Sequence, residues 1–188
     1  MDLLNFVKNY IPLEESDEQA KKSFVQFIEG FGDNLYTRDN LVAHISPACW
    51  IVNKDRNKVL LAHHNQLDKW AILGGHADGE RDLLKVALKE AAEESNLKNI
   101  KPVYDYPVDL AVVVFPEHIK KGKLVPSHLH YYTVFMLEAD ENEKADINAE
   151  ENSAVAWLDF DEISNKIKDK NDLTLFSRLV RKSRKDTE

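Results

Sequence analysis

Three glutamates in the middle of the chain are spaced so that their carboxylates could hold a metal ion. Glu90, Glu93 and Glu94 lie within residues 82–95, whose apolar spacing predicts a helix. At roughly 100° per residue, Glu94 falls inside the apolar stripe of that helix and Glu90 falls on its edge. A charge against a packed stripe is costly unless it is paired or bound to metal, so a merely solvated acidic face does not account for Glu94. Carboxylates at this spacing suit Mg²⁺ or Mn²⁺.

Two glycines directly precede this helix in a way that suits a phosphorylated ligand. Gly74 and Gly75 follow a predicted short strand over residues 69–73 and let the backbone approach a ligand closely. The start of the next helix offers free amides, which favour anions. The turn could also supply a carbonyl to the metal. Metal ligands, a tight turn and a helix start together predict a metal–diphosphate site.

Three histidines are candidates for binding the substrate at the same place. His128 and His130 alternate on a predicted strand, so both point to one face, where they could hold a phosphate or a second metal. A pair of this kind also occurs as polar lining or half-buried packing. His76 directly follows the glycines and could line the same cleft.

Composition and charge limit the class of protein. The chain has 188 residues, which suits one domain, and 25 basic against 33 acidic residues give a net charge of −8. Such a field repels phosphate backbones, so non-specific nucleic-acid binding is not expected. The single cysteine, Cys49, lies in an apolar run, which predicts core packing and excludes an internal disulfide. Without a predicted signal peptide or membrane span, we expect a reducing cytoplasm.

The order of predicted elements indicates an α/β fold. Helical spacing occurs at residues 2–9 and 17–30, and two further helices close the chain near 160–168 and 171–183. The predicted strands are 42–53, 58–64, 69–73, 100–104, 108–115, 128–138 and 153–158. Strands with one strong central helix and helices at both ends predict an α/β sandwich around a mixed sheet. We expect residues 1–36 to form an N-terminal helical extension packed on a domain of residues 37–188, which includes the C-terminal helices.

The central segment resembles the signature of the Nudix hydrolases. Gly75 opens that signature, and residues 89–97, with the sequence KEAAEESNL, close it at the family spacing. Further landmarks of one Nudix subgroup are Arg38-Asp39-Asn40, His44-Ile45-Ser46, Leu60-Leu61, Trp70, His128-Leu129-His130 and Trp157. The resemblance covers at least residues 38–160 and implies an α/β/α sandwich around a mixed sheet.

The resemblance also implies an activity and its metal ligands. The family chemistry is the attack of water on a phosphorus of a nucleoside diphosphate linked to another group, with Mg²⁺ or Mn²⁺ bound. Glu90 and Glu94 would be the main metal ligands and Glu93 would assist, with the Gly75 carbonyl and Glu80 as further candidates. A small-molecule nucleotide or diphosphate would be the substrate, with no nucleic acid or membrane as partner, and pairing into a homodimer stays open.

Catalytic roles follow from the same resemblance. Lys89 takes the place of an arginine that usually orients a metal-binding glutamate. The proton acceptor would be a glutamate of the signature, Glu93 or Glu94, or one on a later loop, for which Glu150 and Glu151 are the candidates. Gly74 would let the substrate approach the backbone.

The sequence departs from the signature at three positions and leaves two other functions open. Arg81 stands where the signature has its first glutamate, with Glu80 one residue early; Lys89 replaces the arginine; and Asn96 replaces a glycine at the helix end, where asparagine tolerates the left-handed conformation. The first alternative is therefore a non-catalytic ligand-sensing Nudix domain. The second is an isomerase acting on an isoprenyl diphosphate through a cysteine, for which Cys49 in its apolar strand is poorly placed.

Overall fold

A mixed sheet forms the centre of the protein in the computed structural model, which describes residues 2–120, 122–147 and 152–184. In these residues the sheet consists of β1 (Ala43–Val52), β2 (Lys58–His64), β3 (Lys69–Ala71), β4 (Leu73–Gly74), β5 (Lys101–Pro102), β6 (Asp109–Phe115), β9 (His128–Glu138) and β10 (Asn152–Asp159). A separate hairpin is formed by β7 (His118–Lys120) and β8 (Lys123–Val125). The helices are α1 (Leu3–Asn9), α2 (Glu15–Phe31), α3 (Leu83–Ser95), α4 (Ile163–Lys166) and α5 (Lys170–Arg184), with 3-10 turns at Gly32–Tyr36 and Phe160–Glu162.

The central strand β1 is buried along its whole length because both faces of the sheet are covered. It pairs in parallel with β9 and antiparallel with β2 and β4, which makes the sheet mixed. Cys49 and Ile51 belong to one hydrophobic core, whereas Trp50 and Val52 belong to the other. This alternation between two cores explains why β1 reads as a continuous apolar run.

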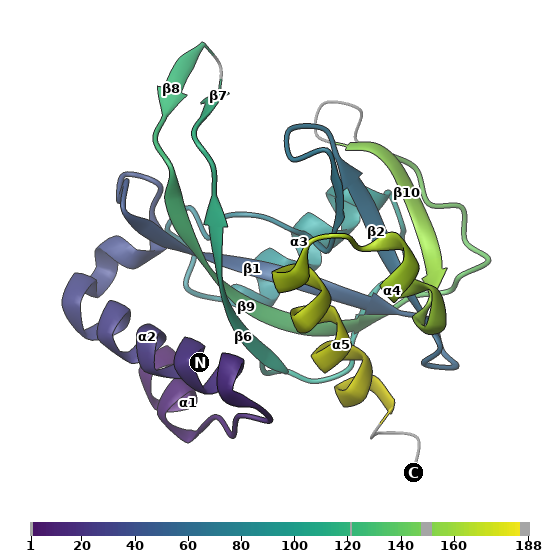
Figure 1. Ribbon diagram of the computed structural model, residues 1–188, viewed down its shortest axis with the longest axis horizontal. Helices are drawn as coiled ribbons and strands as arrows, with labels where there is room; N and C mark the ends of the chain where they lie inside the picture. Colours follow the sequence, from purple (N-terminus) through teal and green to yellow (C-terminus); the bar gives the residue numbers. More distant parts are fainter. Residues whose placement is uncertain (1, 121, 148–151, 185–188) are drawn as a thin grey trace.

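Helices cover both faces of the sheet. The first core packs the sheet against α1, α2 and α3, and includes Val7, Phe24 and Ala87. The second core packs it against α4 and α5, and includes Phe176 and Leu179. Figure 1 shows α5 in front of the sheet and α3 behind it. The predicted α/β/α sandwich around a mixed sheet is therefore confirmed.

Helix α3 begins and ends as its sequence predicts. The side chain of Asp82 accepts a hydrogen bond from the Lys85 amide at 3.1 Å and caps the first turn. Asn96 adopts the left-handed conformation, with φ of 56°, and closes the helix. Cys49 lies beneath this helix, fully buried, with its Sγ 3.1 Å from the Ala87 carbonyl oxygen. Cys49 is thus part of the core, as predicted.

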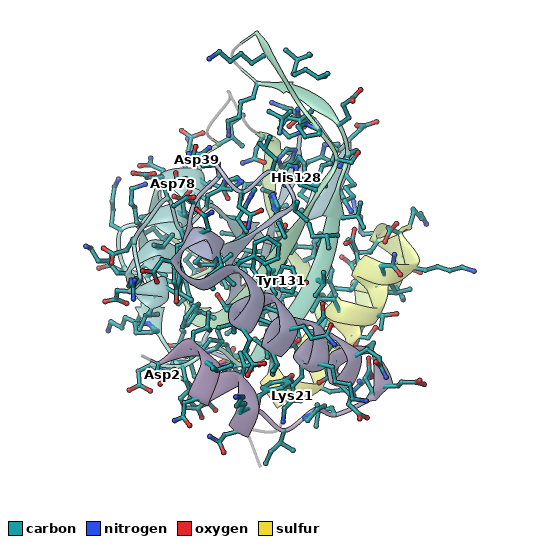
Figure 2. The ribbon with its side chains drawn as sticks, turned by 90° about the vertical axis from the view of Figure 1, so that its left-hand side faces the viewer. Asp2, Lys21, Asp39, Asp78, His128 and Tyr131 are labelled. Atoms are coloured by element: carbon teal, nitrogen blue, oxygen red, sulfur yellow. The ribbon has the colours of Figure 1, made fainter. Side chains whose placement is uncertain are left out.

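The N-terminal helices share the first core with the sheet. The Phe27 ring stacks on Tyr131 of β9 at 4.1 Å, and the Ser23 and Tyr131 hydroxyls lie 2.8 Å apart. Figure 2 shows Tyr131 directly behind α2. These contacts pack residues 2–36 on the rest of the described chain, while the separation of residues 1–36 as an extension from a domain of residues 37–188 stays a prediction.

The β7–β8 hairpin is a difference from the sequence prediction. Residues 116–127 carry no strand pattern long enough to recognise, and Pro116 and Pro126 favour a loop. The structure instead folds residues 118–120 and 123–125 into two three-residue strands that extend away from the sheet (Figure 1).

Among the described residues, the helices are all too short or too polar to cross a bilayer.

Candidate functional site

The diglycine turn brings two glutamates of α3 against the backbone of β4. The Glu94 carboxylate accepts a hydrogen bond from the Gly74 amide at 3.1 Å. The Glu90 carboxylate lies so close to Gly75 that a Cβ built there would sit 2.4 Å from Glu90 Oε2. At Gly74 a Cβ would lie 2.5 Å from the Pro47 carbonyl oxygen, and φ is 150°. Position 74 therefore requires glycine because of the β1 backbone, whereas the absence of a Cβ at Gly75 leaves the room that the Glu90 carboxylate occupies.

Glu90 and Glu94, called here the carboxylate pair, line a cavity of about 810 Å³. Glu94 is only 8% exposed although it carries a carboxylate. Gly74 and Gly75 line the same cavity, and so do His76, His128 and His130. The structure thus gathers at one place most of the residues that the sequence proposes for metal and substrate.

Glu93 and Lys89 lie at the outer edge of this arrangement. The Lys89 ammonium lies 3.2 Å from Glu90 Oε1 and 3.0 Å from Glu93 Oε2. These hydrogen bonds, the one with Glu93 first, raise the pKa of Lys89. The Glu93 side chain is 57% exposed and, unlike the other two, is not part of the cavity lining, since it falls on the solvent side of the helix. The structure therefore brings together two carboxylates, not three.

Glu80 holds the start of α3. Its carboxylate accepts hydrogen bonds from the Arg81 and Asp82 amides at 2.9 and 3.0 Å and from the Lys85 ammonium at 2.6 Å. The Lys85 contact, followed by the Asp82 amide, lowers the pKa of Glu80 to about 2. Arg81 pairs with Asp33 at 2.5 Å. Neither Glu80 nor Arg81 belongs to the described lining of the cavity.

Four imidazoles form a histidine cluster, defined here as His44, His76, His128 and His130. The parallel register of β1 and β9 places His44 directly beside His130, and strand alternation adds His128. The chain after β4 continues along β1, because the Ala77 amide donates to the Ile45 carbonyl oxygen at 3.3 Å, and this brings His76 next to His44. The centroid of the His44 ring lies 4.8 to 4.9 Å from the ring centroids of His76, His128 and His130.

Burial keeps His44, His76 and His130 neutral near pH 7. It lowers the pKa of His44 to about 4 and that of His130 to about 2, and it lowers the pKa of His76 further still. Nearby imidazoles contribute in the same direction. Figure 2 shows His128 at the end of the sheet that carries the β7–β8 hairpin. Neutral rings at this wall can donate a hydrogen bond from one nitrogen and offer a lone pair on the other.

Sequence reasoning did not select several cavity residues. His44 and Arg38 entered only as part of the family resemblance, and Asn152 also lines the cavity. The polar alternation of His44 and Ser46 inside an apolar strand was the available signal. Glu151, the loop candidate for the proton acceptor, and its neighbour Glu150 lie outside the described residues.

Cys49 is not placed to act as a nucleophile. It is fully buried, and burial raises the pKa of its thiol well above the ordinary value. The carboxylates of Glu94 and Glu90 add to this shift. A thiolate, the reactive form, is therefore disfavoured at this position.

Comparisons with known proteins identify the family and support the fold. Residues 43–179 match the family model of the NUDIX domain. An RNA pyrophosphohydrolase of Pelagibacter ubique (strain HTCC1062) is 26% identical over 129 residues, which cover 63% of this chain and 78% of that protein. A NUDIX-family hydrolase of Clostridium perfringens shares the fold with a TM-score of 0.54 at 18% identity, over 73% of this chain and 96% of that one. A C. elegans Ap4A hydrolase, solved as a binary complex, has a TM-score of 0.53 to this structure at 16% identity, over 72% of this chain and 93% of that one. Because the family model covers most of the chain, this protein belongs to the Nudix family.

Proposed function

We propose that this protein is a Mg²⁺-dependent hydrolase that cleaves the diphosphate linkage of a nucleoside-diphosphate-linked or related phosphorylated small molecule. The observation that carries the proposal is the carboxylate pair, held against the Gly74–Gly75 turn in the wall of the cavity. Membership of the Nudix family and the pyrophosphohydrolase relative support the reaction class.

The donor set fits a hard divalent cation. Glu94 is a nearly buried carboxylate, and Glu90 lies beside it against Gly75, whose carbonyl offers a third oxygen. We propose Glu90, Glu94 and the Gly75 carbonyl as ligands, while the positions of Glu93 and Glu80 give these two less support. Bound Mg²⁺ or Mn²⁺ would neutralise diphosphate charge and polarise the phosphoryl oxygens.

The other residues act on the substrate and on the carboxylates. Lys89 orients Glu90 through its 3.2 Å contact. Gly74 lets the diphosphate approach the backbone, and His76, His128 and His130 form the wall of the cavity against which the substrate binds. The proton of the attacking water passes to a carboxylate, for which Glu93, Glu94 and Glu151 are the candidates.

The substrate class and setting follow from charge and composition. A net charge of −8 opposes non-specific binding of a polynucleotide, so we propose a small-molecule substrate. The activity named for the Pelagibacter relative nevertheless places a 5′-triphosphate RNA among the substrates to be tested. A free, buried cysteine is consistent with a reducing cytoplasm. Homodimer formation stays a prediction for sedimentation analysis.

A substrate panel tests the proposal. Wild-type protein with Mg²⁺ or Mn²⁺ should release phosphate or a nucleoside monophosphate from ADP-ribose, dinucleoside polyphosphates, nucleotide sugars, oxidised nucleoside triphosphates or a 5′-triphosphate RNA. Glu94→Gln should lose roughly a hundredfold or more in kcat, since the metal supplies several kcal/mol of transition-state stabilisation. Glu29→Gln, an exposed carboxylate paired with Lys8, is the matched control and should leave turnover unchanged. Equal turnover by wild type and Glu94→Gln on every substrate would refute the assignment.

A ligand-sensing domain without catalysis is the second candidate. It is favoured by one observation: position 81, where the signature has a glutamate, is an arginine paired with Asp33, and the Glu80 carboxylate bonds to the start of α3 and is not part of the described cavity lining. Calorimetry that detects nucleotide binding without any hydrolysis would select this function. The isomerase alternative loses its support, because Cys49 is buried beneath α3 with a raised pKa.

A further inference from the structure

Three members of the histidine cluster are arranged like metal ligands. His44, His76 and His130 each present a ring nitrogen, and these nitrogens lie within 4.8 Å of one another. They come from β1, from the segment after β4 and from β9, so three separate parts of the sheet hold them in place. Nothing in the proposed hydrolysis at the carboxylate pair requires this convergence.

His44 presents a nitrogen whose hydrogen-bonding capacity is unused. Its Nδ1 lies 3.3 Å from the Asn40 carbonyl oxygen, which accepts only an N–H, so Nδ1 carries the proton. The lone pair is then on Nε2, which is buried and has no hydrogen-bond partner, in a side chain only 4% exposed. An imidazole anchored through one nitrogen to a backbone carbonyl, with the other nitrogen free, is the arrangement that metal-binding histidines adopt.

Hydrogen bonds also orient His130. Nδ1 of His128 lies 2.8 Å from the Pro126 carbonyl oxygen and therefore donates to it. In this tautomer Nε2 of His128 carries the lone pair and accepts from His130 Nε2 at 2.9 Å. Nδ1 of His130 is left with its lone pair. His128 is thus a positioning residue for His130.

We propose that His44, His76 and His130 form a binding site for a divalent transition-metal ion such as Zn²⁺, separate from the Mg²⁺ site at the carboxylate pair. Imidazole nitrogens suit Zn²⁺, Ni²⁺ or Fe²⁺, whereas Mg²⁺ prefers oxygen ligands. Tetrahedral Zn–N bonds of about 2.0 to 2.1 Å place ligand nitrogens roughly 3.4 Å apart, so each pair of rings would close by at most about 1.4 Å.

Three protein ligands leave one position of such an ion open. His44, His76 and His130 all line the cavity that also holds the carboxylate pair. The open position would accept an oxygen of a phosphorylated substrate. This role in substrate binding rests on the proposed function, whereas binding of the metal does not.

Calorimetry with Zn²⁺ on the tag-free full chain tests the proposal. The titration is made near neutral pH in the presence of millimolar Mg²⁺, so that a site made of carboxylates is already filled. We expect one Zn²⁺ per chain, and visible absorption of bound Co²⁺ should report nitrogen ligands in tetrahedral geometry. His44→Gln and His76→Gln should each weaken binding by at least about tenfold.

Two matched variants distinguish binding at this site from binding at a surface histidine or at the carboxylate pair. His63→Gln removes a histidine of β2 that contacts Ser153 and is not part of the cavity lining, and should leave Zn²⁺ affinity unchanged. Glu94→Gln should also retain Zn²⁺, even where it abolishes hydrolysis. Failure to bind Zn²⁺, equal affinity in His76→Gln and wild type, or loss of binding in Glu94→Gln or with excess Mg²⁺ would overturn the proposal. His76 is only half-buried, so its variant remains informative if His44→Gln does not fold.

Discussion

At the scale of single residues, Lys89 is the substitution in the signature with the clearest structural consequence. Its ammonium contacts both Glu90 and Glu93, so it joins a glutamate of the cavity to one on the surface. A lysine does this as a point charge, whereas an arginine would offer a planar two-pronged contact. Lys89 can therefore still orient Glu90, as the arginine of the signature would, but it fixes the direction of the Glu90 carboxylate less tightly.

The role of Lys89 can be measured with two substitutions. Lys89→Met should lower kcat/KM by roughly tenfold, about 1.4 kcal/mol, because Glu90 loses its orienting cation. Lys89→Arg should retain or exceed the wild-type value. Steady-state kinetics at several Mg²⁺ concentrations checks both, and Lys85→Met, which removes another exposed lysine of α3, is the control. Wild-type kinetics in Lys89→Met would contradict the role.

The histidine cluster makes stability sensitive to acid. Burial lowers the pKa of His44 to about 4 in the folded protein, against 6.5 in the unfolded chain. Between these values the unfolded chain binds more protons, so the stabilisation is complete above pH 6.5 and is lost as the pH falls towards 4. The charged and titratable groups near His44 are Arg38, Asp78, His76, His128 and His130.

We expect a measurable loss of stability on mild acidification. A histidine with a lowered pKa changes the free energy of unfolding by up to about 1.4 kcal/mol per pH unit between its folded and unfolded pKa values. Urea unfolding in a chelating buffer should therefore show a lower midpoint at pH 5 than at pH 7, and the difference should be smaller for His44→Gln. If the midpoint falls by the same amount between pH 7 and pH 5 in wild type and in His44→Gln, His44 does not titrate as described.

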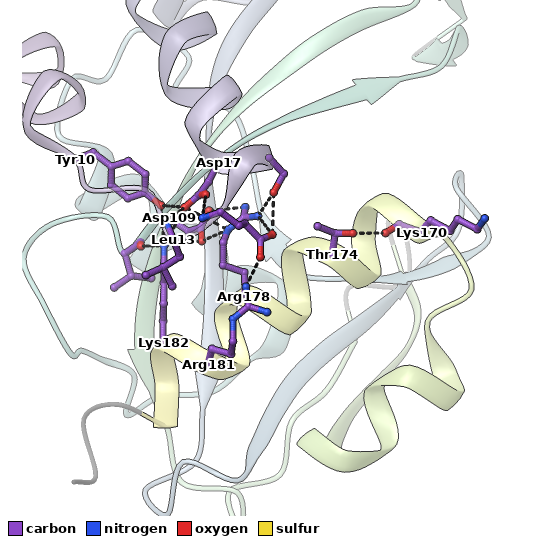
Figure 3. A network of polar contacts seen from close by, with 12 residues as sticks. Tyr10, Leu13, Asp17, Asp109, Lys170, Thr174, Arg178, Arg181 and Lys182 are labelled. Carbon is purple, nitrogen blue, oxygen red and sulfur yellow. Dashed lines mark hydrogen bonds and ion pairs between the residues drawn. The ribbon is translucent and has the colours of Figure 1, made fainter.

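At the scale of elements, a buried ionic network joins the start of α2, β6 and α5 (Figure 3). Arg178 of α5 makes two hydrogen bonds of 2.8 Å to Asp109 of β6 and one of 3.0 Å to Glu14. The Asp17 carboxylate lies 3.7 Å from the same guanidinium and accepts from the Tyr10 hydroxyl. The network closes the N-terminal helices onto the C-terminal helix.

In this network, hydrogen bonds and nearby opposite charges offset the cost of burying charged side chains. Burial opposes the charge of Asp17, but hydrogen bonds from the Leu13 and Glu14 amides lower the pKa of the carboxyl. Burial lowers the pKa of Lys182, against the attraction of Asp109, which lies 2.8 Å away. Removing one partner would leave buried charge uncompensated, and such losses are large.

Two arginines of α5 test the difference between buried and exposed pairs. Arg178→Met should destabilise the protein by about 3 to 5 kcal/mol, because Asp109 and Asp17 lose their buried cation at a site only 3% exposed. Arg181→Met removes the 50% exposed partner of Glu14 and should cost at most about 1 kcal/mol. Chemical denaturation of both variants gives the comparison, and similar values would contradict the assignment of buried charge.

At the scale of the whole molecule, the N-terminal helices and the C-terminal helix belong to one packed structure. Phe24 and Phe27 lie in the same core as Ile45 of β1, and Trp50 of β1 donates to the Ser183 hydroxyl of α5 at 2.8 Å. Residues 1–36 are therefore not expected to unfold separately, whatever boundary is drawn after them.

Hydrogen exchange measures this cooperativity. Under native conditions, protected amides of α2, β1 and α5 should exchange with one common free energy of opening. Mass spectrometry of proteolytic fragments resolves the three elements, with the exposed β7–β8 hairpin as the fast-exchanging comparison. Exchange of α2 at a distinctly lower free energy than β1 would instead support an independent N-terminal extension.

Local pattern was sufficient for the elements, and for part of the site. The predicted strand over residues 128–138 coincides with β9, and the predicted helix over 82–95 is α3 within one residue. Period and capping are properties of neighbouring residues, so the chain itself carries them. The β7–β8 hairpin was not predicted because its strands are too short for a period to show.

The amino-acid sequence alone determined the fold class, the helix that carries Glu90 and Glu94, and the need for close backbone approach at Gly75. Lys89 and Glu93 are i, i+4 neighbours on that helix, so their ion pair also follows from local spacing. Only the tertiary structure decided that His44 faces His130. This contact depends on a parallel register between strands more than eighty residues apart. Local spacing does not encode it, because contacts between distant segments form only when the whole sheet is assembled.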